Sequence, residues 1–150
     1  MRILGLDLGT KTLGVSVCDN TETIASFVGT IRFNENNFKE SLKELGNIIN
    51  YYNAKKLVLG LPKNMNNTFG DAAKRSLDFK ELLTNEFNII VELQDERLTS
   101  VTANKILLEA DASRKKRKQK VDGIAATIIL QNYLDIRKEQ KNNGKWNETR

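Results

Sequence analysis

Residues 1–19 read MRILGLDLGTKTLGVSVCD, and this stretch decides how the fold begins. Two mainly apolar runs, residues 2–8 and 13–18, flank a Gly-Thr-Lys-Thr segment at residues 9–12. Glycine and threonine between two short apolar runs are typical of a tight connection between strands. The stretch therefore predicts a β-hairpin.

Asp7 is the only acid in the first of these runs. Side chains alternate between the two faces of a strand, so Asp7 shares a face with Gly5, while the leucines of the other face form a core. If the four-residue loop sets the register, Asp7 lies opposite Gly14 and Gly5 lies opposite Ser16. The carboxylate then stands on a floor with few side chains, where a metal ion or a phosphate can reach the backbone. The alternative is an aspartate at a strand end that hydrogen-bonds the turn.

The composition is that of one soluble globular domain. The chain has 150 residues, of which 39% are hydrophobic and 29% charged, both ordinary fractions for such a domain. No apolar run approaches the ~20 residues that span a bilayer, and no signal peptide precedes the first strand. We therefore expect a cytoplasmic protein with no membrane partner. The single cysteine, Cys18, excludes an internal disulfide and a cysteine-rich zinc site.

The sequence contains no histidine, which narrows the possible chemistry. Nucleophile pairs that depend on histidine, an imidazole general base and most zinc catalysis are excluded. Carboxylate chemistry remains, for which Mg²⁺ or Mn²⁺ is the natural electrophile. The net charge of +5 and the pI near 9.3 favour an anionic partner, of which nucleic acid is the commonest.

The rest of the chain predicts an α/β domain. Residues 24–32 read as a third strand that completes an antiparallel meander. Apolar residues spaced by three and four predict a helix over residues 38–52, and the apolar run at residues 56–61 predicts a buried strand. A helix between two strands is the crossover that parallel pairing requires, so the sheet is expected to be mixed.

Further elements complete a five-stranded mixed sheet flanked by helices. The pattern predicts a helix over residues 70–86, opened by Thr68 and Asp71 as a capping pair, a strand at 89–93, a helix from Thr99 or Ser100, a basic loop at 114–120 and a last helix over 121–137. We expect one domain over residues 1–138 and a flexible polar tail over 139–150.

Acids occur at three informative places. Asp7 lies within the first strand, Glu96 or its neighbour Asp95 follows the last strand, and Asp122 begins the last helix. Each has an ordinary structural explanation: Asp95 and Glu96 as strand-exit residues and Asp122 as a charge favoured by the helix dipole. Phosphodiester hydrolysis, however, uses a cluster of carboxylates that holds two cations about 3.5–4 Å apart and requires no histidine.

Four stretches resemble the YqgF/RuvX family across nearly the whole chain up to about Arg137. They are DLGTKTLGVSVCD at 7–19, LVLGLPKNMNNTFG at 57–70, DERLTS at 95–100 and KVDGIAATIILQNYLD at 120–135. The resemblance implies a ribonuclease H-like fold related to the RuvC Holliday junction resolvases. It also implies a nuclease that matures the 5′ end of precursor 16S ribosomal RNA. The family's catalytic and metal-binding acids, for a pair of Mg²⁺ or Mn²⁺ ions, carry over onto Asp7, Glu96 and Asp122.

The substrate is expected to be structured RNA or branched DNA. The basic run leads directly into Asp122, and the asparagine-rich loop at residues 63–68 follows a buried strand, so both are expected to contact the nucleic-acid backbone. The residues expected to bind substrate are Lys11, Asn64, Arg97, Arg114, Lys115, Arg117, Lys118 and Lys120.

Three alternatives stay open at the level of sequence. Sugar kinases and actin-like ATPases also carry an Asp-x-Gly-Thr loop after a strand, but they close two lobes on a nucleotide and this chain is long enough for only one. A Holliday junction resolvase acting on branched DNA would use the same acids. A non-catalytic nucleic-acid-binding module could keep the fold without the activity. The sequence does not indicate an oligomeric state.

Overall fold

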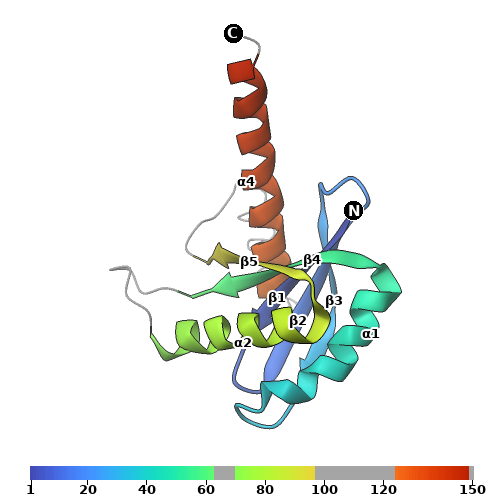
Figure 1. Ribbon diagram of the computed structural model, residues 1–150, viewed down its shortest axis with the longest axis vertical. Helices are drawn as coiled ribbons and strands as arrows, with labels where there is room; N and C mark the ends of the chain where they lie inside the picture. The colour runs from blue at the N-terminus through green and yellow to red at the C-terminus, as the bar shows by residue number, and fades with distance from the viewer. Residues whose placement is uncertain (63–69, 97–123, 149–150) are drawn as a thin grey trace, which may run out of the picture.

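The computed structural model describes residues 1–62, 70–96 and 124–148, with side chains placed up to residue 140 in the last helix. One sheet lies between helices on its two faces (Figure 1). The elements in chain order are β1 (Arg2–Leu8), β2 (Thr12–Cys18), β3 (Ala25–Arg32), the 3-10 helix η1 (Phe38–Ser41), α1 (Leu42–Tyr52), β4 (Ala54–Leu61), α2 (Asp71–Phe87), β5 (Ile90–Asp95) and α4 (Ile124–Glu148).

The sheet is mixed and has the order β3-β2-β1-β4-β5. The hairpin of β1 and β2 has the predicted register, with Asp7 opposite Gly14 and Gly5 opposite Ser16. Its turn is closed by the Gly9 amide, which donates to the Thr12 carbonyl at 2.8 Å. β3 extends the meander, whereas β4 pairs parallel with both β1 and β5. The five-stranded mixed sheet is therefore confirmed.

One expected neighbour was wrong. From the sequence we expect the strand before Glu96 to lie beside the strand of Asp7, but β4 lies between β1 and β5. The reason is the order of the crossovers: the first helical crossover places β4 against β1, and the second places β5 on the far side of β4.

The helices end where the sequence allows the chain to turn back. α1 and α2 are followed by Asn53 and Asn88, both in the left-handed conformation with φ of 52° and 49°. Asparagine tolerates this conformation better than most residues. The N-cap of α2 is Gly70, which makes no side-chain hydrogen bond. Thr68, the first residue of the predicted capping pair, lies outside the described residues.

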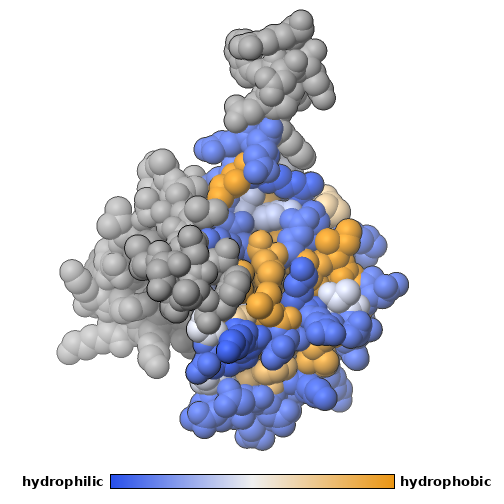
Figure 2. Space-filling view, turned by 60° about the vertical axis from the view of Figure 1, so that its left-hand side comes forward, coloured by the Kyte–Doolittle hydropathy of each residue, from blue (hydrophilic) through white to orange (hydrophobic). Residues whose placement is uncertain are grey.

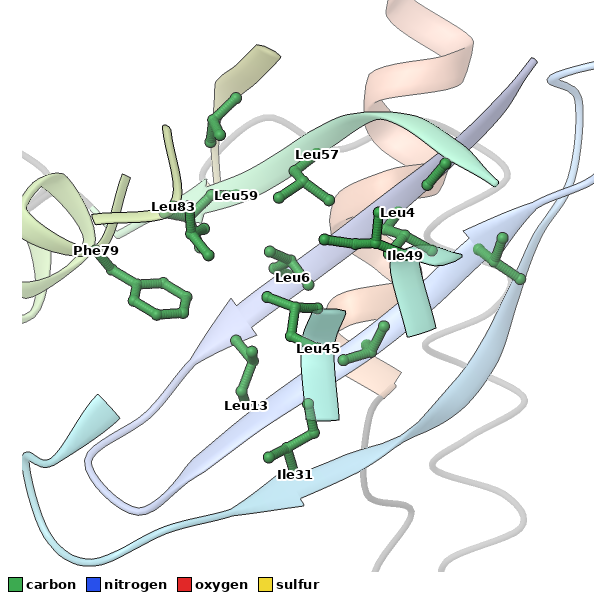
Figure 3. Packing of buried hydrophobic residues seen from close by; sticks show 14 of the residues in the cluster. Leu4, Leu6, Leu13, Ile31, Leu45, Ile49, Leu57, Leu59, Phe79 and Leu83 are labelled. Atoms are coloured by element: carbon green, nitrogen blue, oxygen red, sulfur yellow. The ribbon is translucent and has the colours of Figure 1, made fainter. Parts of the chain in front are cut away.

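The main core lies between the sheet and the pair α1 and α2. Leucines of β1 and β4 face apolar side chains of these two helices, as Figure 3 shows for Leu4, Leu6, Leu45, Leu57 and Phe79. All five are fully buried. Ring centroids of Phe38 and Phe79 lie 5.5 Å apart in an edge-to-face arrangement, which joins η1 to α2.

The second core lies under α4, on the face that carries Gly5 and Asp7. Ile3 and Val58 pack there against Ile129, Leu130 and neighbouring residues of α4. A Cβ at Gly5 would lie 2.6 Å from the Cβ of Leu130 and 2.9 Å from the Ala126 carbonyl oxygen. The floor expected to be open is therefore covered by α4 at Gly5, because the missing side chain lets the helix approach.

Ser16 ties the start of α4 to the sheet. Its hydroxyl lies 2.8 Å from the Ala126 carbonyl oxygen and donates to it. α4 then continues through Glu148, beyond the predicted end at residue 137, and its distal part projects past the sheet (Figure 1). The division into a domain over 1–138 and a flexible tail over 139–150 stays a prediction.

Several predicted features lie outside the described residues. These are the asparagine-rich loop, the helix from Thr99 or Ser100, the basic loop and Asp122. Of the described helices, none combines the length and the apolar character needed to cross a membrane. The described surface in Figure 2 is mainly hydrophilic, with apolar residues in separate smaller areas.

Candidate active site

Asp7 is the next-to-last residue of β1, the central strand of the sheet, close to the turn into β2. Leu6 pairs with Leu59 of β4, so the next residues along the two parallel strands, Asp7 and Gly60, are neighbours. On the other side Asp7 faces Gly14 of β2. The carboxylate is thus flanked in the sheet by two glycines. Burial raises its pKa.

Glu96 comes directly after β5, and the backbone of β4 fixes its position. Its amide donates to the Leu61 carbonyl at 3.2 Å. Its side chain lies over Gly60, where an added Cβ would be 3.1 Å from Glu96 Oε1 and would also contact Ile129 of α4. The carboxylate of Glu96 therefore lies on the α4 face of the sheet, the face of Asp7.

The two acids sense each other electrostatically. Burial raises the pKa of Glu96 to about 7, with further contributions from the negative charges of Asp7 and Asp95. Within the described part of the chain, neither Asp7 nor Glu96 has a cationic partner. Two buried carboxylates, one of which is destabilised in its charged form by the other, are a suitable site for a positive ion.

Asp95 belongs to the opposite face of the sheet. It pairs with Leu61, and Leu57 and Leu59 of the same strand point into the core under α1 and α2. Side-chain alternation therefore directs Asp95 away from α4. Of the two neighbouring acids, Glu96 is the one that shares a face with Asp7.

The donor set fits a hard divalent cation. Carboxylate oxygens are the ligands that Mg²⁺ and Mn²⁺ prefer, and Gly14 and Gly60 place no side chain beside Asp7. Among the described residues no group of three potential ligands is present. Asp122 precedes the first described residue of α4, Ile124, by two positions in the sequence and lies outside the described residues.

The other predicted site residues are only partly placed. Lys11 lies exposed in the turn between β1 and β2, and its carbonyl accepts a hydrogen bond from the Phe33 amide at 2.9 Å. Lys11 therefore belongs to the same end of the hairpin as Asp7. The remaining expected substrate-binding residues lie outside the described residues: Asn64, Arg97, Arg114, Lys115, Arg117, Lys118 and Lys120.

Gly60 and Gln94 were missed by sequence reasoning. A glycine inside an otherwise apolar strand is a known sign of close approach by another group, and this signal was available for Gly60. Gln94 lies two residues before Glu96 and so faces α4 as well, but nothing in the local pattern marks a glutamine there as functional.

Comparison with known proteins identifies the family. The family model described as "RuvX: Holliday junction resolvase" matches residues 1–136. A Geobacillus sp. (strain WCH70) protein named "Putative pre-16S rRNA nuclease" is 50% identical over 135 residues, which cover 90% of this chain and 98% of that protein. The protein of the same name from Bacillus subtilis (strain 168) is 49% identical with the same coverage.

Solved structures with this fold are more distant in sequence. Thermus thermophilus RuvC in complex with a Holliday junction substrate has a TM-score of 0.61 at 12% identity, covering 93% of this chain and 96% of that one. Fowlpox virus resolvase in complex with Holliday junction DNA has a TM-score of 0.52 at 14% identity, covering 90% and 97%. These likenesses confirm the ribonuclease H-like fold. The matched family model and the curated relatives show that the chain belongs to the RuvX family.

Proposed function

We propose that this protein is a metal-dependent endonuclease that hydrolyses phosphodiester bonds at the 5′ end of precursor 16S ribosomal RNA. Membership of the RuvX family supports the enzyme class, a nuclease. The named relatives at about half identity, aligned over 90% of this chain, support the substrate. Such a role implies a protein of the cytoplasm, where ribosomal RNA precursors are processed.

The observation that carries the proposal is the pairing of Asp7 and Glu96 on one face of the sheet. Asp7 belongs to the first strand, and Glu96 directly follows the fifth. Burial raises both pKa values, and the negative charge of Asp7 adds to the rise at Glu96. A purely structural acid would normally have a hydrogen-bond donor or a cation beside it. A bound positive ion would supply such a partner for Asp7 and Glu96.

Asp7, Glu96 and Asp122 would hold the ion, and we propose Mg²⁺ or Mn²⁺ with two ions in the working site. When bound, such ions activate a water molecule and stabilise the leaving oxygen of a phosphodiester. The chain itself supplies rigid placement: Asp7 is fixed by pairing on both sides, and Glu96 is anchored by its amide bond to Leu61.

Basic side chains would position the substrate. We propose that Lys11, at the turn beside Asp7, and the residues of the basic run contact phosphates of the nucleic acid without reading its sequence. The same role is proposed for Asn64 and Arg97. A net charge of +5 supports binding to a polyanion in general.

Resolution of Holliday junctions is the second candidate function. The description of the matched family model favours it, and the RuvC neighbour was solved with such a junction. Both substrates present the same phosphodiester to the same acids, so the distinction rests on the shape of the nucleic acid.

The deciding experiment offers both substrates to the purified protein. A precursor 16S 5′ end and a four-way DNA junction are incubated side by side, with and without Mn²⁺. We expect metal-dependent cleavage of the RNA by the wild type and none by Glu96→Gln. Asp95→Asn, which alters the neighbouring acid on the other face, is the matched control and should still cleave. Cleavage of the junction alone would replace the proposed substrate, and cleavage of neither would contradict the nuclease assignment.

A further inference from the structure

A pocket of about 400 Å³ opens between β5 and α4 on the face that carries Glu96. Its walls combine two basic side chains with amide and hydroxyl groups. It is lined by Lys56, Glu92, Gln94, Tyr133, Arg137 and Gln140, together with one apolar residue of α4. None of these residues has a role in the proposed metal site.

Gln94 carries an unused hydrogen-bond donor in this pocket. The residue is only 7% exposed, and its side-chain nitrogen Nε2 has no hydrogen-bond partner among the described residues. Leaving a buried amide donor unpaired costs about 1–3 kcal/mol, so such groups usually have an acceptor in the functional state. The Nε2 group of Gln94 can therefore donate to an acceptor that enters the pocket.

The pocket lies on the same face of the sheet as Glu96, and Gln94 in its lining is two residues from Glu96 along the chain. Gln94 pairs with Gly60, and Glu96 Oε1 lies where a side chain of Gly60 would begin. Adjacent strands are about 4.8 Å apart, and two residues along a strand span about 7 Å. A group bound at Gln94 thus lies beside the Glu96 carboxylate at a distance comparable with the separation of neighbouring phosphates on one strand.

Lys56 is the first of the two cations in the pocket. Its Nζ lies 3.1 Å from Glu92 Oε1 and donates to the Tyr133 hydroxyl at 3.1 Å. These two partners leave one of its three N–H donors for a further acceptor.

Arg137 supplies the second cation. Its Nη1 pairs with Glu22 at 3.1 Å, outside the lining of the pocket, and a guanidinium has five N–H donors, so others remain. The guanidinium carbon lies 5.9 Å from the centre of the Tyr133 ring, which keeps the group at the pocket wall. The lining of the pocket thus contains two cations and the amide donor of Gln94 but only one carboxylate, that of Glu92. This excess of positive charge and donors favours an anion.

We propose that this pocket binds the backbone phosphate adjacent to the scissile one, with Gln94 Nε2 as its buried donor and Lys56 and Arg137 as its cations. The inference rests on the proposed function, since it assigns a second contact to the same substrate strand. Phosphodiester oxygens only accept hydrogen bonds, which matches the walls of the pocket. Such a contact fixes the register of the strand over Asp7 and Glu96 without reading bases.

The test couples a protein change to a change at one phosphate. Binding of the precursor 16S 5′ end is measured in EDTA, so that turnover does not enter. Each phosphate near the cleavage position is replaced in turn by a neutral methylphosphonate. At one neighbouring phosphate, we expect the replacement to weaken wild-type binding about tenfold, the size of a hydrogen bond to a charged group. Gln94→Leu should bind unmodified RNA about tenfold more weakly and show no further weakening at that phosphate.

Controls distinguish loss of phosphate binding from loss of folding and from loss of nuclease activity. Gln94→Leu should melt no lower than the wild type, because it removes an unpaired buried donor; Gln94→Met, of similar length, replaces it if the leucine variant does not fold. If Gln94→Leu instead removes sensitivity to a single 2′-deoxy substitution, or if the two effects are simply additive at every phosphate, the phosphate assignment is overturned. Wild-type cleavage in Mn²⁺ is scored separately, so a failure of the nuclease proposal is distinguishable.

Discussion

The carboxylate of Glu96 occupies the space above Gly60 that a side chain at that position would fill. A Cβ there would lie 3.1 Å from Glu96 Oε1 and 3.2 Å from its Cδ, and would also contact Ile129. The lack of a side chain at Gly60 of β4 therefore leaves room for the carboxylate of Glu96, the residue after β5, on the face of Asp7.

Gly60→Ala should displace Glu96 and reduce cleavage. A misplacement of about 1 Å at a catalytic group can cost on the order of a hundredfold in rate, and overpacking against Ile129 should cost about 1–3 kcal/mol of unfolding free energy. Single-turnover cleavage and denaturant unfolding measure the two effects. The control is Gly29→Ala, because a Cβ at Gly29 meets nothing within 4 Å. Equal cleavage by both variants would show that the position of Glu96 is not critical.

Asp7→Asn should abolish stabilisation by metal. The substitution keeps the shape and removes one of two repelling charges, so the apo protein should melt at the same temperature as the wild type or higher. Millimolar Mn²⁺ should raise the melting temperature of the wild type but not that of Asp7→Asn; at a hundred times the Kd the gain in unfolding free energy is about 2.7 kcal/mol. Asp78→Asn, at an exposed position of α2, is the control and should respond like the wild type. Equal responses of wild type and Asp7→Asn would remove Asp7 from the ligand set.

Without metal, the stability of the protein should fall as the pH rises from about 4.5 to about 7. The folded protein holds the Glu96 proton more tightly than the unfolded chain, because the pKa is about 7 in the fold and ordinarily 4.5. The raised pKa of Glu96 therefore stabilises the fold fully below about pH 4.5, and this stabilisation is lost as the pH rises through about 7. Melting temperatures across this range measure the trend.

Glu96→Gln supplies the comparison for this pH dependence. The variant has no proton to release at this position, so its melting temperature should change less with pH. At about pH 8 it should melt at a higher temperature than the metal-free wild type. For the wild type, affinity for Mn²⁺ should increase through about pH 7, since protons compete with the ion. Parallel stability curves for the two proteins would mean that Glu96 titrates near its ordinary pKa.

The basic run should supply electrostatic affinity. Replacing Arg114, Lys115, Arg117 and Lys118 with serine should weaken binding to all nucleic-acid sequences alike. The slope of log affinity against log salt should become shallower by about 0.9 for each duplex phosphate that the protein no longer neutralises. Serine substitutions at Lys39 and Lys43, exposed near the start of α1, are the control. An unchanged slope in the variant with these four serines would show that the four residues do not contact phosphates of the nucleic acid.

The hairpin could be predicted in detail from the sequence, because two local rules were sufficient. The turn length fixed the register, and the alternation of leucines with Gly5 and Asp7 fixed which face is apolar. The helices of residues 38–52 and 70–86 were also found to within a few residues, although η1 replaces the first turn of the former. Local pattern decides these elements, and the structure follows it.

Features that depend on packing between distant elements were not predictable in the same way. The sequence does not say that β4 separates β1 from β5, or that Gly5 serves the approach of α4. The unpaired donor of Gln94 exists only because β5 and α4 enclose it. The acids Asp7 and Glu96 were predicted from residue type and resemblance. That they lie on the same face of the sheet could be known only from the order of the strands.

The strand order also bears on when the enzyme can become active during its synthesis. Asp7 is made with the first strand and Glu96 only after the fifth, and β4 must be in place between them before the two carboxylates share a face. Contacts between segments so far apart in the chain form late, and the second core closes only when α4 has been made. A partly synthesised chain, still attached to a ribosome and surrounded by ribosomal RNA, therefore has no assembled site with which to cut it.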